Sequence, residues 1–532
     1  MESQKQDAFY KWVALLVVVF GTFMAILDTS IVNIAIPKMM AVFGVSTNDI
    51  QWVLSGYMLT MGAVIPLSGY FADTYGSKKT YVWALVLFTV GSALCGFAWS
   101  NTAMIIARII QALGGGMIMP VSMMILYQVV PQEERGMALG IWGIAAMAAP
   151  AIGPTLSGYI VEHLDWRLIF TINIPVGVVA VILAGLLLKE SPSKPAKSFD
   201  YLGFILSATG LVSILYILGE GSTIQWSDFK VVGLLMLGVF SLVLFVINEL
   251  THEDPLLDLR ILKIWPFTLS IMISGMVNIA MFGGIFLLPL FLQNLQGYSA
   301  VQTGILMFPS AIATGITMPI GGKLFDRFGA KPVVIPGLII LTWTTYLLAQ
   351  LTLESNATYI TWVLILRGLG MGLSMMPATT AGMNSVPFHL VARASALSNV
   401  LRQIAGSLGI AVLTTIMQNR LVYNYSQLVE QASSFNSNTQ DVLKYIQGGL
   451  SSTGLALSEI RGVSLGILTG LVQKQAALIA INDTLLVTCF IALITLPLAL
   501  MMRGKKANKP AEVAGAADSK AGVANQPQLV MD

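Results

Sequence analysis

Long runs of apolar residues alternate with short polar gaps along almost the whole chain. A membrane-spanning helix needs about 20 consecutive, mostly apolar residues, and fourteen segments satisfy this requirement. The predicted spans cover residues 12–36, 51–71, 79–99, 103–127, 137–160, 168–188, 201–219, 230–250, 267–292, 302–322, 332–352, 359–383, 394–418 and 478–501. The pattern therefore predicts an all-α, polytopic membrane protein with fourteen transmembrane helices.

One polar motif occurs twice between apolar runs. The segment GYFADTYGSKK begins at Gly69 and returns as GKLFDRFGAK, which begins at Gly322. The residues at equal offsets are Gly69 and Gly322, Asp73 and Asp326, Gly76 and Gly329, and Lys78 and Lys331. A repeated loop in a membrane chain indicates two structurally related halves.

The spacing of this repeat predicts an insertion between the halves. Its two aspartates are 253 residues apart (326 − 73), which corresponds to about eight spans at roughly 30 residues per span and loop. Two six-helix halves account for six of these spans, so two further helices must lie between them. The predicted domains are an N-terminal six-helix bundle at 1–190, the inserted helices with linkers at 191–262, a C-terminal six-helix bundle at 263–503, and a disordered cytoplasmic tail at 504–532.

The distribution of basic residues predicts the orientation. If the amino terminus is cytoplasmic, most Lys and Arg residues of the short gaps fall on the cytoplasmic side, and only Lys38, Arg167 and Lys230 fall outside. Cytoplasmic loops of membrane proteins carry such an excess of positive charge. We therefore expect a multi-pass protein of the cell membrane with both termini and both repeat loops on the cytoplasmic side. The end of the molecule that carries the repeat loops is called the inner face below.

Composition narrows the functional classes. The chain is 56% hydrophobic and 10% charged, whereas soluble domains carry roughly 25% charged residues. The sequence contains no G-x-x-x-x-G-K-[ST] phosphate loop, and its two cysteines and three histidines are widely separated. We therefore expect no enzyme activity, no metal site, no organic cofactor and no nucleic-acid partner. Any energy that the protein needs must come from an ion gradient or from a partner protein.

Two charged residues lie inside predicted spans. Asp28 lies in the first span, where a lone ionised carboxylate costs several kcal/mol, so we expect it to be paired or protonated part of the time. Its role is either a titrating group that carries a proton or attracts a cation, or a neutral acid in a structural hydrogen bond. Arg108 lies in the fourth span and cannot lose its charge, so it needs a partner inside the membrane. It either influences the protonation of an acid on another span or forms a purely structural pair. Arg367 is its counterpart in the second half.

Further candidates lie in loops and at helix ends. In the fifth span, Pro150 and Pro154 share one face among Ala and Gly residues, which favours a close, sliding helix interface. The repeat loops are expected to form a latch between the halves, or to act as insertion signals. Glu220 and Asp483 are either second proton sites or solvated charges at helix ends.

The segment 419–477 is predicted to be a large outer loop with short amphipathic helices. Its Ser, Asn, Gln and Gly content exceeds that of the neighbouring spans. A loop of this length is either functional, as a lid or an adaptor contact, or a passive connection.

Four segments together resemble the motifs of the major facilitator superfamily, and specifically its fourteen-span drug:proton antiporter branch. They are LDTSIVNIAIP, GYFADTYGSKK, RIIQALGGG and WRLIFTINIPVG, and the resemblance extends over residues 12–502. The residues that it implicates are Asp28 and Arg108 in proton coupling; Gly69, Asp73, Gly76, Lys78, Gly322, Asp326, Arg327 and Gly329 in the inner latch; and Gly140, Pro150, Gly153, Pro154 and Gly158 in the antiporter helix. Ala149 and Ser157 replace two glycines of the fifth-span motif.

The resemblance implies an exporter driven by the proton-motive force, which moves amphipathic, often cationic toxic compounds by alternating access, with protons as the coupling ion. Two alternatives keep the fold: a proton-coupled exporter of one metabolite, lipid or siderophore, and a proton symporter that imports. A third is a non-transporting receptor or channel subunit. The expected partners are small amphipathic substrates and the lipid bilayer, and a periplasmic adaptor in a bacterium with two membranes.

Overall fold

The computed structural model describes residues 2–190, 199–220, 228–432, 437–451 and 457–502. Within these residues, fourteen helical segments are long and apolar enough to cross a membrane. The predicted all-α fold with fourteen transmembrane helices is therefore confirmed. The predicted disordered tail at 504–532 lies outside the described residues.

The longer helices alternate direction across the bundle. Their bounds are α1 Glu2–Phe43, α2 Thr47–Tyr75, α3 Ser77–Gly96, α4 Asn101–Val129, α5 Arg135–His163, α6 Leu168–Thr171, α7 Asn173–Leu187, α8 Tyr201–Glu220, α9 Phe229–Thr251, α10 Trp265–Leu290, α11 Ala300–Phe328, α12 Lys331–Leu348, α13 Ala357–Met383, α14 Val391–Gln431, α15 Ser437–Leu450 and α16 Leu457–Met501.

Local sequence determines where several of these helices begin and end. The Ser46 side chain accepts a hydrogen bond from the Asp49 amide at the start of α2, and Ser299 and Gln302 form a capping box at the start of α11. Such caps satisfy amide groups that have no partner within the helix. Gly76 and Gly329 have φ values of 91° and 87°, a conformation that favours glycine, and they allow the tight reversals in the two repeat loops.

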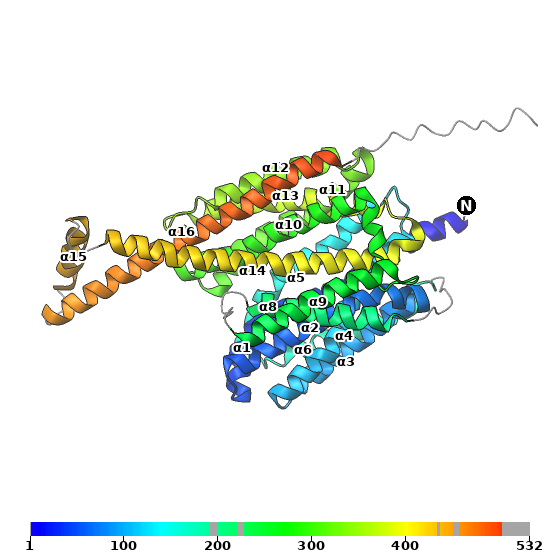
Figure 1. Ribbon diagram of the computed structural model, residues 1–532, viewed down its shortest axis with the longest axis horizontal. Helices are drawn as coiled ribbons and strands as arrows, with labels where there is room; N and C mark the ends of the chain where they lie inside the picture. The colour runs from blue at the N-terminus through cyan, green and yellow to red at the C-terminus, as the bar shows by residue number, and fades with distance from the viewer. Residues whose placement is uncertain (1, 191–198, 221–227, 433–436, 452–456, 503–532) are drawn as a thin grey trace, which may run out of the picture.

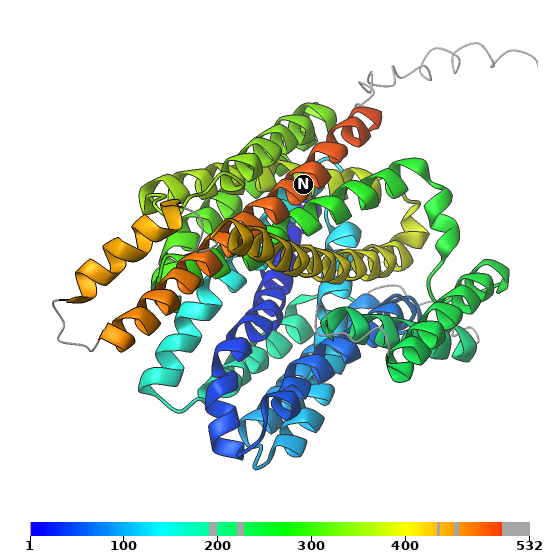
Figure 2. The same ribbon diagram turned by 60° about the vertical axis from the view of Figure 1, so that its left-hand side comes forward.

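The helices form two bundles that lie side by side (Figures 1 and 2). Helices α1 to α7 pack among themselves, as do α10 to α14 and α16. The bundles meet where α5 lies along α11 and where α14 lies against α2 and α4. The helices α8 and α9 pack on each other, and α8 contacts both α2 and α14, so the inserted pair lies beside the junction of the bundles.

Two helices extend far beyond the bundle at the end opposite the N-terminus (Figure 1). Helix α14 continues to Gln431, α16 begins at Leu457, and α15 packs against α16. The sequence prediction of a separate loop of short helices at 419–477 is wrong in this respect. Neither 419–431 nor 457–477 contains a proline, so nothing interrupts the backbone hydrogen bonds of either helix.

The first helix also differs from its prediction. The predicted first span ends at residue 36, whereas α1 contains Pro37 and continues for six residues beyond it, to Phe43. Proline removes only one backbone donor, and hydrophobic packing of Ile31, Val32 and Met39, all fully buried, holds this part of the helix in place.

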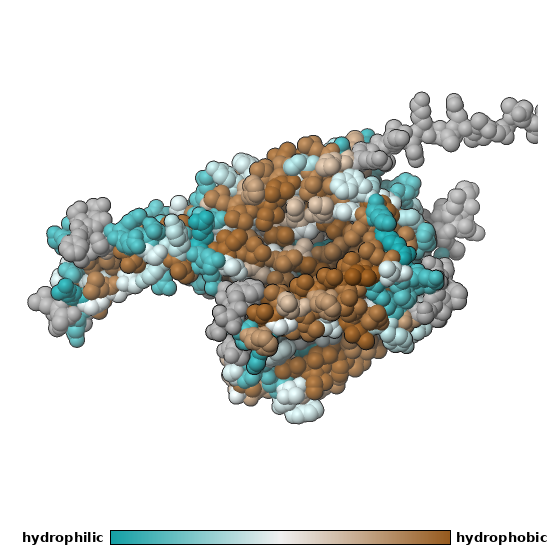
Figure 3. Space-filling model, in the orientation of Figure 1, coloured by the Kyte–Doolittle hydropathy of each residue, from teal (hydrophilic) through white to brown (hydrophobic). Residues whose placement is uncertain are grey.

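Hydrophobic side chains cover the surface of the bundle. On the face shown in Figure 3, a broad apolar belt runs across the helices, and polar side chains border it at the inner face and on the extension. Exposed Leu186, Met236, Phe240 and Ile305 are among the residues that present apolar surface. Such a belt matches the hydrocarbon core of a bilayer.

Candidate functional site

A buried ion pair lies inside the N-terminal bundle. Asp28 on α1 is 0% exposed and Arg108 on α4 is 1% exposed, and the distance from Arg108 Nη1 to Asp28 Oδ2 is 2.6 Å. The two residues are 80 positions apart in sequence. Each supplies the opposite charge that the other needs inside a membrane.

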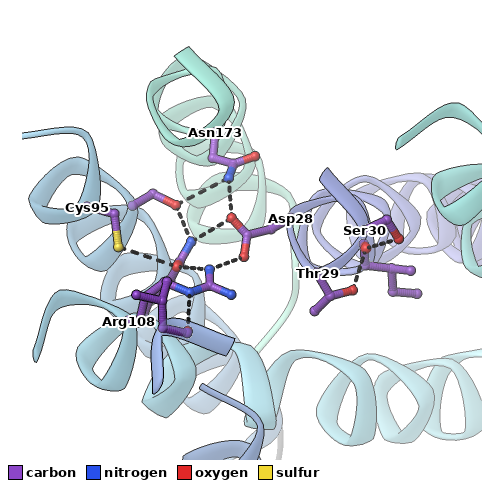
Figure 4. A network of polar contacts seen from close by, with 10 residues as sticks. Asp28, Thr29, Ser30, Cys95, Arg108 and Asn173 are labelled. Carbon is purple, nitrogen blue, oxygen red and sulfur yellow. Dashed lines mark hydrogen bonds and ion pairs between the residues drawn. The ribbon is translucent and has the colours of Figure 1, made fainter. Parts of the chain in front are cut away.

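Two amide side chains complete the surroundings of the carboxylate (Figure 4). Gln111 Nε2 on α4 and Asn173 Nδ2 on α7 each donate to Asp28 Oδ1 at 2.9 Å. The same two nitrogens also donate to Ser92 Oγ on α3. All three groups facing Asp28 are donors, which matches an ionised carboxylate because that group only accepts hydrogen bonds.

The guanidinium of Arg108 is held from several sides. Its Nη1 also donates to Gln111 Oε1 at 2.6 Å, and its Nε donates to the Val53 carbonyl of α2 at 3.3 Å. The ring of Tyr57 lies 3.9 Å from the guanidinium carbon, close enough for a cation–π interaction. Arg108 is therefore fixed in place, and a proton on Asp28 would remove its only ionic partner among the described residues.

The polar residues around this pair were not assigned from the sequence. Gln111 and Asn173 lie within the segments RIIQALGGG and WRLIFTINIPVG, but neutral amides in apolar runs are less conspicuous than charges. Cys95 also lies beside these residues, with its Sγ 3.7 Å from Gln111 Oε1. The sequence signal that could have identified Gln111 and Asn173 is the position of a polar side chain among otherwise apolar residues.

Among the described residues, no acid of the C-terminal bundle pairs with Arg367 as Asp28 pairs with Arg108. Arg367 on α13 is buried and donates from Nη2 to the Ala280 carbonyl on α10. Helix α10 contains no Asp or Glu. A Cβ at Gly284 would lie 2.1 Å from Arg367 Nη1, so only glycine leaves space for this side chain. The ion pair is thus a feature of one half only.

The two aspartates of the repeat contact opposite bundles at the inner face. Asp73, at the end of α2, pairs with Arg393 of α14, with Oδ2 3.5 Å from Nε. Asp326, at the end of α11, accepts hydrogen bonds from the amides of Gly136 and Met137 at 2.9 and 3.0 Å. A carboxylate is favourable at the N-terminus of a helix such as α5. Each repeat loop therefore joins its own half to the other.

Glycines let the backbones meet at this contact. A Cβ on Gly322 would lie 1.9 Å from the Gly136 carbonyl oxygen, and a Cβ on Gly136 would lie 2.3 Å from the Gly322 carbonyl oxygen. By contrast, Gly69 has Ala396 Cβ at 3.4 Å, an ordinary contact. Arg135 adds a hydrogen bond to Asn384 of α13 at 3.0 Å. The two bundles are therefore in direct contact at this end of the molecule, an arrangement called closed below.

The basic residues of the repeat loops have different surroundings. Lys78 lies 3.7 Å from Glu190, at the end of the N-terminal half. The Arg327 guanidinium lies 5.2 Å from the ring of its neighbour Phe328. Neither side chain forms a described ion pair with the opposite bundle, so the two aspartates make the ionic and helix-end contacts.

Helix α5 lies between the acid-bearing helix and the other bundle. At its middle, a Cβ on Gly153 would lie 2.7 Å from Ser30 Cβ of α1, and Ser157 Oγ donates to the Ile31 carbonyl at 2.6 Å. At its inner half, a Cβ on Gly140 would lie 2.5 Å from the Met318 carbonyl oxygen of α11. Helix α5 thus touches α1 within three residues of Asp28.

The other predicted residues of α5 contribute less. Pro150 and Pro154 both lie within the helix, and Pro150 is partly buried. A Cβ on Gly158 would meet no atom within 4 Å. Gly158 is therefore not needed for packing in this conformation.

The two further acids lie away from the buried pair. Asp483 on α16 is partly exposed, and its Oδ2 lies 3.7 Å from Arg420 Nε on α14. Glu220 is the last residue of α8, and its side chain lies outside the described part. Asp483 therefore has the surroundings of a solvated ion pair beside the extension.

Sequence comparisons identify relatives over most of the chain. The profile of the Major Facilitator Superfamily matches residues 18–410. The MFS-type transporter YhcA of Bacillus subtilis is 38% identical over 93% of both chains. The multidrug transporter protein MdtP of Bacillus subtilis is 33% identical over 81% of both, and the multidrug export protein EmrB of Escherichia coli is 31% identical over 80% of this chain and 84% of its own.

Solved structures show the same fold at low sequence identity. The human organic anion transporter MFSD10 superimposes with a TM-score of 0.59 at 12% identity, over 91% of this chain and 99% of its own. The proton:xylose symporter XylE superimposes with a TM-score of 0.56 at 13% identity, over 92% and 97%.

Proposed function

The chain belongs to the major facilitator superfamily, and from that premise we propose that it is a proton-driven exporter of amphipathic toxic compounds. Its family and relatives are membrane transporters rather than enzymes. The relatives named as multidrug transporters support export, and the proposal extends that activity to this chain. We place it in the cell membrane with both termini in the cytoplasm.

The observation that carries the proposal is the buried Asp28–Arg108 pair. A carboxylate inside a membrane can take up and release a proton, and Arg108 cannot. A proton on Asp28 would neutralise the pair's negative partner and weaken its bonds to Gln111 and Asn173, which come from two other helices. Proton binding would therefore alter the packing of α1, α4 and α7 together.

Helix α5 offers a mechanical connection from this pair to the inner face. It packs closely on α1 beside Asp28, and its N-terminus holds Asp326 of the other bundle. A shift of α1 would therefore press on the helix that closes the inner face. In the proposed cycle, substrate enters from the inside, the bundles rock, and protonation of Asp28 accompanies release outside.

The available driving force is sufficient for export. One charge that crosses a potential of 100 mV supplies about 2.3 kcal/mol. At room temperature this corresponds to a concentration ratio of roughly fifty. One proton per substrate therefore supports substantial accumulation against a gradient.

The experiment is uptake into everted membrane vesicles that contain the full chain. The probes are ethidium, Nile red and pyrenebutyrate, which are cationic, neutral and anionic. We expect saturable, respiration-driven uptake of at least one probe, abolished by a protonophore. Saturable uptake that persists after the proton gradient is collapsed would contradict proton coupling, and the lack of saturable uptake of any probe would contradict the proposed function.

Substrate breadth decides between this proposal and an exporter of one compound. Uptake of structurally unrelated probes supports multidrug export, as in the relatives named for it. If the protein works with a periplasmic adaptor, export from intact cells should require that second protein. Uptake into everted vesicles should not require the adaptor.

A further inference from the structure

A third arginine of the membrane-spanning helices, Arg402, is partly buried and lies where the two bundles meet. Arg402 is seven residues after Ser395 on α14, and Ser395 Oγ donates to the Pro120 carbonyl of α4 at 2.9 Å. Seven residues are about two helical turns, or ~10 Å, so Arg402 shares the Ser395 face of α14. Its Cα therefore lies deeper in the membrane than the inner contacts, along the seam between α14 and α4.

The side chain of Arg402 is directed back toward the inner face. Helical side chains lean toward the N-terminus of their helix, and the N-terminus of α14 lies at the inner face. Tyr127, seven residues beyond Pro120 on α4, lies within electrostatic range of Arg402. The arginine of one bundle thus lies near a tyrosine of the other.

The guanidinium has an edge without partners. Arg402 Nε and Nη2 are both buried, and neither has a hydrogen-bond partner among the described residues. No described carboxylate forms an ion pair with it, in contrast to Arg108 and its partner Asp28. Nε and Nη2 lie on the same side of the planar group, and two donors arranged in this way bind a carboxylate with two parallel hydrogen bonds.

A charged group whose donor edge is buried without a partner is costly, and a ligand with the opposite charge would offset that cost. We propose that Arg402 binds the acidic group of an amphipathic, anionic substrate. This inference rests on the proposed export function and specifies its substrate class as carboxylates and sulfonates with an apolar body. The sequence prediction of often cationic substrates would then not describe the preferred ones.

The closed inner face also explains how such a substrate would leave. In this conformation the donor edge of Arg402 is buried, so the edge is not accessible to a ligand. Separation of α4 and α14 at the inner face would uncover it to the cytoplasm. The subsite therefore forms when the protein faces inward and is lost when the inner face closes, which lowers substrate affinity on the releasing side.

The test compares three probes with one apolar body. Pyrenebutyrate, pyrenebutyramide and pyrenebutyl-trimethylammonium differ only in the charge of the end group. Initial uptake rates are measured in everted vesicles that contain the full chain. We expect wild-type protein to prefer the carboxylate over the amide at least tenfold, as expected for a charged hydrogen-bonded pair. Arg402→Gln should lose this preference while its uptake of the amide persists.

Two further variants separate charge from geometry. Arg402→Lys keeps the charge without the planar fork, so it should retain an intermediate preference. Arg420→Gln is the matched control, because Arg420 lies on the same helix in an exposed ion pair with Asp483. This variant should transport all three probes like the wild type.

The outcomes distinguish the two proposals. Equal wild-type uptake of the carboxylate and the amide, or a preference that survives in Arg402→Gln, would overturn the subsite and leave proton-driven export standing. If the wild-type protein shows no protonophore-sensitive uptake of any probe, the proposed export function itself would be overturned. If Arg402→Gln does not accumulate in the membrane, the test uses thermal unfolding of the purified wild-type protein instead. The proposed subsite predicts that pyrenebutyrate raises the unfolding temperature more than pyrenebutyramide does, and equal effects of the two compounds would overturn it.

Discussion

Arg108, which is buried, and Arg402, which is partly buried, have opposite surroundings. Arg108 is bound to Asp28, Gln111 and the Val53 carbonyl, whereas the Nε and Nη2 atoms of Arg402 have no partner among the described residues. Removal of one member of a buried ion pair leaves an uncompensated charge, whereas removal of an unpaired charge relieves a cost. Substitution of Arg108 should therefore lower stability, whereas substitution of Arg402 should not.

Arg108→Met should destabilise the protein by about 3–5 kcal/mol, because Asp28 loses its ionic partner. The double variant with Asp28→Asn should recover part of this loss, since no charge is then left unpaired. Thermal unfolding of the purified proteins in detergent measures both effects. Strictly additive effects of the two substitutions would contradict the pairing.

Arg402→Met is the companion variant. It removes a charge without a described partner, so thermal stability should be unchanged or higher than in the wild type. A loss as large as that of Arg108→Met would mean that Arg402 is a structural member of the bundle rather than a substrate contact.

The sequence exposes charged residues in the membrane but not their partners. Asp28 and Arg108 are conspicuous within apolar runs, yet only the fold brings residues 80 positions apart to within 2.6 Å. The contributions of Gln111 and Asn173 could not be predicted, because uncharged amides are tolerated in many membrane helices. Arg402 was not identified for a related reason: the absence of a partner is visible only in three dimensions.

At the scale of elements, the closed inner face depends on close backbone contact between α5 and α11. Gly322→Ala places a Cβ against the Gly136 carbonyl at 1.9 Å, so it should destabilise the closed inner face by about 1–3 kcal/mol. Spin labels introduced at Tyr75 and Phe388, which are exposed residues on opposite bundles, should report a longer inner distance. Gly233→Ala, where an added Cβ meets no atom within 4 Å, is the control.

An unchanged distance distribution in Gly322→Ala would contradict this role of the glycine contact. A change of equal size in Gly233→Ala would indicate a general effect of alanine in helices.

The extension makes a different prediction. Helix α15 packs against α16, and its Val442 and Tyr445 side chains are exposed. Replacement of residues 432–456 by a Gly/Ser linker of equal length should therefore change the free energy of unfolding by only about 0.5 kcal/mol, as for surface changes. Vesicle uptake should persist if this segment is a passive connection. Loss of uptake with normal stability would instead assign it the role of a lid.

Element boundaries were less predictable than the number of elements. Apolar runs indicate where a helix crosses the hydrocarbon core, but they do not indicate where it stops once it leaves the membrane. Helices α14 and α16 continue into polar sequence, and α1 continues past Pro37. Polar helix-forming residues and tertiary packing determine these ends. Neither of them can be recognised from the positions of the apolar runs.

At the scale of the whole molecule, the repeat spacing was sufficient to predict the inserted helices α8 and α9. It could not predict that α8 lies against both α2 and α14, because the insertion has no counterpart in either half. The sequence also could not predict whether the two bundles are closed or open at the inner face. Closure of the inner face follows from contacts such as Asp73 with Arg393 and Asp326 with the start of α5.

The central claim is that Asp28 couples proton movement to export. The most direct measurement is substrate-dependent proton flux in everted vesicles with an acidic interior, followed with a pH-sensitive dye while a transported probe is added. Wild-type protein and Asp441→Asn, a change in an exposed pair on α15, should dissipate the gradient when the probe enters. Asp28→Asn should move the probe down its own gradient without moving protons. Proton flux and uphill uptake that persist in Asp28→Asn would contradict the account.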